Sequence, residues 1–205
     1  MMERNQQTNP LDSIIDFCYC QTSLNYWRHD IQQFIRASCC QNTGFTGADY
    51  GNMLAHYRHL YEHIQSLHVL LYSYPDWKTS FNHPCYQLTV TGNFITIVDH
   101  DMKDDSTLKF SSLSKDEILN LQLFMRRFFE FKPLHGWLHT LDRMFEMVFS
   151  PETFAQGNPE AFKIFSFLEK LGEAIFLVYE IRGKEHLLAH HAEHYGIPRK
   201  KLVDA

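Results

Sequence analysis

The sequence predicts a mostly helical α+β domain, and three observations lead to that class. Apolar residues recur at helical spacing on both sides of segment 85–111, where apolar and polar residues alternate instead. A complete helix-start signal follows at Leu113 to Ile118, so the alternating segment is bounded by helix. The chain of 205 residues is long enough for one domain with a substantial core. We therefore expect a single domain over 1–205.

The N-terminal part, 11–72, is predicted to be a helical hairpin. Its first helical stretch runs from Leu11 to about Ser38, with a break expected at Gln21–Thr22–Ser23. The second runs from about Ala48 to Tyr72 and is ended by the turn signal Tyr74–Pro75–Asp76. Apolar residues of this second helix share one stripe: Met53, Tyr57, Leu60, Ile64, Leu67 and Leu71.

The central part, 85–111, is predicted to be an antiparallel meander of two or three strands. A two-residue turn at Gly92–Asn93 would let four apolar residues share one face. The expected pairs on that face are Val90 with Ile95 and Leu88 with Ile97. Thr107 to Phe110 could return as a third strand. Since such a small sheet needs helices over its apolar face, we expect it to cover part of the central helix of the bundle that follows.

The C-terminal part, 114–196, is predicted to be a helical bundle. Ser114 and Glu117 have the spacing of a capping box, in which each side chain bonds the other residue's amide. The helix that they start ends at Lys132–Pro133. Three more helices are expected at Pro133–Phe149, Asn158–Arg182 and from Gly183 to Tyr195. The helix at Asn158–Arg182 has little polar face, which is typical of a helix in the centre of a core.

Charge and composition exclude some classes of protein. The net charge of −5, without a basic cluster large enough to displace counterions, argues against binding of duplex DNA. Apolar runs fall short of the roughly 20 residues that a transmembrane helix needs, and the N-terminus lacks a signal-peptide pattern. Five unevenly spaced cysteines do not suggest a disulfide framework. These features predict a cytoplasmic protein.

Thirteen histidines are unusual for this length, and several lie at helical spacing. His135, His139 and Asp142 would share one face of their helix, and two imidazoles with a carboxylate can hold zinc or iron. Completed by His56, His59 or His63, such a site would indicate a metal-dependent hydrolase. The simpler explanation is that these residues form the water-facing side of an amphipathic helix. The main expectation is therefore no cofactor.

Arg58 and His63 have the R-x4-H spacing seen in HEPN-type ribonucleases. When the three spacings that this class allows are counted together, nine arginines and thirteen histidines give about 1.7 matches by chance, and one is present, so the motif is not enriched. A β-hairpin in mid-chain also fits poorly with an all-helical nuclease. HEPN-like ribonuclease activity is the third functional alternative.

Aromatic residues concentrate in the first eighty positions, which carry few charges. Tyr, Trp and His with little charge are typical of an interface centre, and Tyr57, Tyr61 and Trp77 are the candidate contacts. The same composition also suits a tightly packed helix pair. The hypothesis that we favour is a non-catalytic interaction or regulatory module that binds a protein partner, with a second copy of the chain among the candidates. Whether the protein is an enzyme stays open.

Overall fold

The computed structural model describes the backbone of residues 9–40, 47–74, 77–78, 86–91, 94–99, 107–183 and 186. Within these ranges the side chains of 20, 47–48, 86–91, 94–99 and 107–109 are not described. The helices are α1 (Pro10–Asp16), α2 (Leu24–Cys39), α3 (Gly47–Ser73), α4 (Lys115–Leu119), α5 (Leu121–Phe131), α6 (Leu134–Val148) and α7 (Ala161–Val178), with π-helical turns η1 (Phe17–Gln21) and η2 (Tyr179–Gly183). The strands are β1 (Tyr86–Thr91), β2 (Phe94–Asp99) and β3 (Thr107–Phe110).

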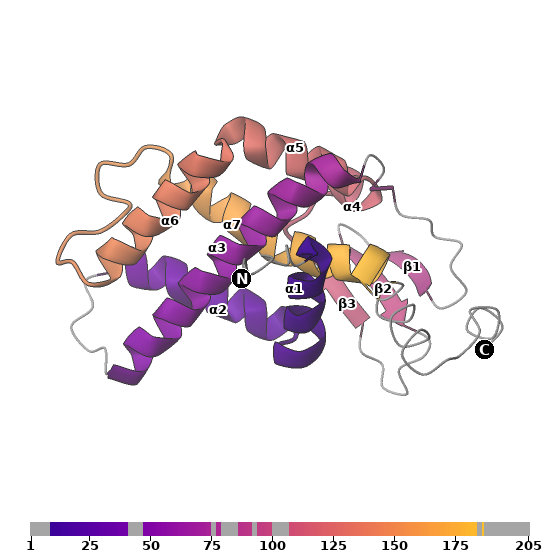
Figure 1. The fold of residues 1–205 in the computed structure, drawn as a ribbon, viewed down its shortest axis with the longest axis horizontal. Coiled ribbons are helices and arrows are strands. Elements are labelled where there is room, and N and C mark those ends of the chain that lie inside the picture. Colours follow the sequence, from indigo (N-terminus) through magenta and orange to yellow (C-terminus); the bar gives the residue numbers. More distant parts are fainter. Residues whose placement is uncertain are drawn as a thin grey trace, which may run out of the picture.

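Two helices organise the bundle. α3 crosses the molecule diagonally in Figure 1 and packs against α1, α2, α5 and α6. α7 runs through the middle and packs against α2 and α5. The sequence predicts both helices, and the predominantly apolar C-terminal half of α7, from Leu171 to Val178, is buried throughout, whereas its N-terminal half keeps exposed residues such as Phe162.

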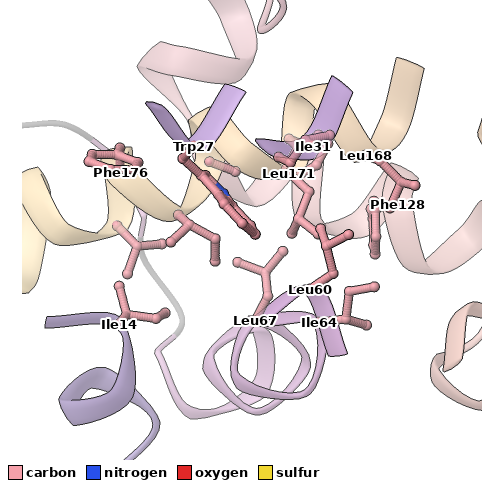
Figure 2. Packing of buried hydrophobic residues seen from close by; sticks show 14 of the residues in the cluster. Ile14, Trp27, Ile31, Leu60, Ile64, Leu67, Phe128, Leu168, Leu171 and Phe176 are labelled. Atoms are coloured by element: carbon pink, nitrogen blue, oxygen red, sulfur yellow. The ribbon is translucent and has the colours of Figure 1, made fainter. Parts of the chain in front are cut away.

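The core lies where α2, α3 and α7 meet. Figure 2 shows Trp27 of α2 reaching across toward Leu60 and Leu67 of α3. α2 approaches α7 so closely that a Cβ atom built on Gly172 would lie 2.6 Å from Cδ1 of Ile31. Such close packing leaves the three helices little freedom to shift against one another.

The α+β class expected from the sequence is wrong for this fold, which is a helical bundle. In the part of the chain whose side chains are described, the core is enclosed by helices packed on helices. Phe110 is the one strand residue within that described core. The strands contact chiefly one another, and in the described part of the chain none forms an extensive backbone contact with α7.

The strands lie together at one end of the bundle (Figure 1). β1 pairs antiparallel with β2, and β2 pairs antiparallel with β3. Val90 is opposite Ile95 in the first pair. The predicted turn at Gly92–Asn93 and most of the last predicted helix, from Gly183 to Tyr195, lie outside the described residues.

Capping chemistry marks some helix starts but not others: α5, α6 and α7 begin without a side-chain cap, and α7 starts at Ala161 and not at the predicted Asn158. The capping box at Ser114 is confirmed: its hydroxyl accepts from the amide of Glu117, whose carboxylate accepts from the Ser114 amide at 2.9 Å. The break near Thr22 is also confirmed, because η1 ends there and Ser23 caps α2. One predicted helix is divided, however. Asn120 is extended and bridges to Lys78, so that α4 and α5 are separate helices.

Two buried carboxylates fix the segment that leads into α4. Glu173 of α7 accepts hydrogen bonds from the backbone amides of 111–113 at 2.8–3.0 Å. Glu117 lies 2.8 Å from Lys170 of α7. Burial would raise the pKa of Glu117, but the hydrogen bonds from Lys170 and Ser114 outweigh burial and lower it.

Among the described residues, no helix combines the length and the apolar character needed to cross a bilayer.

Candidate functional site

The most extensive surface feature that carries predicted site residues is a row of five aromatic rings along the seam of α3 and α6. Neighbouring rings contact one another in the order Tyr61, Tyr57, Phe145, Phe149 and Tyr50, and we call this set the aromatic ladder. The ring centroids of successive members are 5.8, 4.7, 5.1 and 5.0 Å apart. All five rings are accessible from outside the molecule: four are half-buried, and Phe149 is 55% exposed.

Helix geometry explains why the ladder forms. Tyr50, Tyr57 and Tyr61 recur at intervals of seven and four along α3, so they share one edge of that helix. Phe145 and Phe149 are four apart at the end of α6 and meet that edge. Tyr57 stacks nearly parallel on Phe145, and Tyr50 on Phe149. The ladder therefore depends on the packing of α3 against α6.

A hydrogen bond fixes the middle of the ladder. The hydroxyl of Tyr57 donates to Oδ1 of Asp142 across 2.6 Å. Partial desolvation and this carboxylate acceptor raise the pKa of Tyr57 to about 12. The hydroxyl thus stays protonated, and the Tyr57 ring is held in one orientation above Phe145.

Two of the three predicted binding residues lie in the ladder, and the third lies elsewhere. Tyr57 and Tyr61 are half-buried members of it. Trp77 is completely buried, and its indole nitrogen donates to the carbonyl oxygen of Leu70. Trp77 is therefore a core residue of this fold, out of reach of a partner.

Sequence reasoning missed Tyr50, Phe145 and Phe149. In α6 the fully buried stripe is centred on Trp137, Leu141 and Met144. Phe145 is left at the edge of that stripe. A pair of Phe residues four apart at this edge is the signal that could have found it.

The predicted metal residues are not brought together. His135 and His139 are both exposed on α6, and the carboxylate of Asp142 accepts the Tyr57 hydrogen bond. His56 of α3 lies 3.7 Å from Asp30 of α2 instead of facing α6. Within the described ranges, no three His, Cys, Asp or Glu side chains are arranged to hold a metal ion. The described side chains therefore do not assemble the zinc or iron site.

His63 and Arg58 also lie in different environments. The His63 ring is buried against Phe17 and Trp27, with centroids 4.4 and 5.5 Å away, while Arg58 is exposed. Burial, with a smaller contribution from His59, lowers the pKa of His63 to about 3, so the ring is neutral. The R-x4-H pair does not present one accessible surface on which an RNA phosphodiester could bind both side chains.

Comparisons with protein-family models, with curated proteins and with solved structures found no match to this chain.

Proposed function

We propose that this protein is a cytoplasmic, non-catalytic interaction module that binds a protein partner through the aromatic ladder of α3 and α6. The observation that carries this proposal is the ladder itself. Five contacting rings form a continuous accessible row, and the hydrogen bond between Tyr57 and Asp142 fixes its middle.

Physical properties of the ladder suit an interface centre. Tyr and Phe rings offer a large contact area and lose little side-chain entropy on binding. Their entropy loss is smaller still here, since each ring is already packed against its neighbours. The tyrosine hydroxyls supply polar groups beside the apolar rings, which is the usual arrangement at an interface rim.

The chemistry of the partner follows from the same surface. Phe145 and Phe149 provide flat apolar area that aliphatic or aromatic side chains can cover. We therefore expect a protein segment that places apolar anchors against the ladder. The cytoplasmic assignment rests on the sequence and is supported by three free thiols among the described residues, at Cys18, Cys39 and Cys40.

Photo-crosslinking can test this proposal with a matched control in the same chain. The photoreactive amino acid benzoylphenylalanine replaces Phe149 in one variant and Phe162 in another. Phe162 lies on α7 outside the ladder and is 84% exposed, more than Phe149 at 55%. Exposure alone therefore favours crosslinking at 162, whereas a partner bound to the ladder favours 149.

The crosslinked protein is then identified, purified and titrated against the wild type and the Phe149→Ala and Phe162→Ala variants. We expect the Phe149 change to weaken binding by roughly tenfold or more, as for a central interface aromatic. The Phe162 change should have no effect. Equal crosslinking at both positions, or equal affinity of both variants, contradicts the proposal. Crosslinking to a second copy of this chain identifies the partner as the protein itself.

A further inference from the structure

A cavity of about 350 Å³ lies beside the opposite edge of α6 from the aromatic ladder. Thr140, Arg143 and Met147 line it from the helix, and residues 152–159 form its other wall. Gly157 in this wall has a φ angle of 77°, a left-handed conformation that favours glycine. The amide of Phe154 donates to the carbonyl oxygen of Ser38, which anchors the wall to α2.

The cavity has an apolar side and a cationic rim. The half-buried Met147 supplies most of the apolar lining, and the buried Phe154 and Ile164 lie behind it at the base of the cavity. The cations of the rim are Arg143 and Lys132, and the exposed imidazole of His139 lies beside them as a hydrogen-bonding group. A hydrocarbon group and a charged group of one molecule could therefore be accommodated at the same time.

The cations of the rim differ in how far they are already neutralised. Lys132 donates to Glu160 across 2.9 Å and lowers the pKa of that carboxyl, so its charge is largely balanced. Arg143 has no ion pair with any residue in the part of the chain that the structure describes. Its guanidinium can offer two parallel hydrogen bonds to a carboxylate or a phosphate group.

Glu152 is the one carboxylate among the residues that line the cavity. It would repel a second negative charge on the same molecule. A ligand with a single oxyanion head at the Arg143 side avoids this repulsion, and a hydrogen-bond donor at its other end could bond to Glu152.

We propose that this cavity binds a small organic oxyanion, with its carboxylate or phosphate head on Arg143 and His139 and its apolar body against Met147, Phe154 and Ile164. This site is separate from the aromatic ladder, because its residues lie on the other edge of α6. The inference does not depend on the proposed partner binding.

Titrations followed by isothermal calorimetry and by amide NMR shifts can test it. Phenyl phosphate and phenylacetate are the two probes, since they share a ring and differ in the head. Inorganic phosphate lacks the apolar body, and benzyl alcohol lacks the charge. The variants are Arg143→Gln, the matched control Arg126→Gln on another exposed arginine, and Glu152→Gln.

We expect saturable binding of at least one probe, with shifts at His139 and Gly157. Arg143→Gln should weaken it by roughly tenfold, as expected for loss of a charge-assisted hydrogen bond, and Arg126→Gln should not. Glu152→Gln should tighten binding, since it removes a nearby negative charge. The probe that binds more tightly identifies the head group.

Several results would overturn the proposal. Absence of saturable binding for both probes would contradict it, and so would equal binding by the Arg143→Gln and Arg126→Gln variants. Inorganic phosphate binding as tightly as phenyl phosphate would show that the apolar side takes no part. If benzyl alcohol bound as tightly as both probes, the charged head group would take no part in binding.

Discussion

The guanidinium of Arg28 lies 2.6 Å from the carboxylate of Glu173, a residue of α7 that is completely buried. The same carboxylate accepts from the backbone amides of Ser111, Ser112 and Leu113. It therefore satisfies buried donors of two other segments at once, and it joins α2, α7 and the entry to α4 in one network.

Removal of this carboxylate should strongly destabilise the folded protein. We expect Glu173→Ala to lower the free energy of unfolding by about 3–5 kcal/mol, because it removes the buried acceptor that the Arg28 guanidinium and three backbone amides share. Urea unfolding followed by circular dichroism measures the change. Glu62→Ala, at an exposed position of α3, is the control and should change stability by less than about 0.5 kcal/mol. Equal losses in both variants would contradict a special role for Glu173.

Because of His63, the free energy of unfolding should decrease as the pH is lowered. Its pKa is about 3 in the folded protein, below the ordinary value of 6.5, so the unfolded chain binds more protons between these values. Stability therefore decreases as pH falls through this window, and this residue contributes about 2 kcal/mol of loss from about pH 7 to about pH 5.

Urea unfolding of the wild type and of His63→Phe at both pH values isolates this contribution. The variant, whose ring cannot be protonated, should lose about 2 kcal/mol less than the wild type over the same interval. His135→Asn, which changes an exposed histidine of α6, is the control and should keep the wild-type pH dependence. An unchanged pH dependence in His63→Phe would refute the prediction.

The hydrogen bond between Tyr57 and Asp142 should be measurable as a coupling energy. We expect a double-mutant cycle of Tyr57→Phe and Asp142→Asn to give about 1 kcal/mol, a moderate value because Tyr57 is accessible to solvent. The coupling energy is calculated from the free energies of unfolding of the wild type, the two single variants and the double variant. A coupling near zero would show that this bond does not hold the ladder in solution.

Two helical glycines should respond oppositely to alanine. A methyl group on Gly51 of α3 meets no atom within 4 Å, so Gly51→Ala should stabilise the protein by about 0.5–1 kcal/mol. On Gly172 it would lie 2.6 Å from Cδ1 of Ile31, and the cost of overpacking should exceed that gain, so that Gly172→Ala lowers the stability. Thermal unfolding of both variants checks the difference in sign. Ile31→Val should partly relieve Gly172→Ala, since it removes the clashing Cδ1 atom.

Local signals in the sequence predicted helix ends well, because capping depends on neighbours along the chain. The capping box at Ser114 and the break near Thr22 are examples. The interruption at Asn120 was not predictable in this way. It involves a bridge to Lys78, forty-two residues earlier, which no local pattern reveals.

The α+β class failed for a related reason. Alternation along 85–111 predicts which residues can share a face of a hairpin, but not which element that face packs against. The described core is closed by helices, so the sheet is not one of its layers. The class was predicted from the presence of strands, whereas fold class depends on how layers pack.

The candidate site was predictable only in part. Tyr57 and Tyr61 were found from composition, but the same reasoning selected Trp77, since composition does not distinguish a buried indole from an exposed one. Phe145 and Phe149 were missed because they become part of the ladder only when α6 packs on α3. Their place in the ladder is a property of tertiary structure.

All three tryptophans are completely buried, so that their intrinsic fluorescence reports on the state of the core. Trp27, Trp77 and Trp137 lie in different parts of the core, and Trp137 stacks on Phe128 with ring centroids 4.1 Å apart. Indole emission should therefore be blue-shifted in the native protein and move to the red when water enters. Single Trp→Phe variants would assign the shift to one region each, so that loosening of the α2–α7 contact could be distinguished from loosening around α5 and α6.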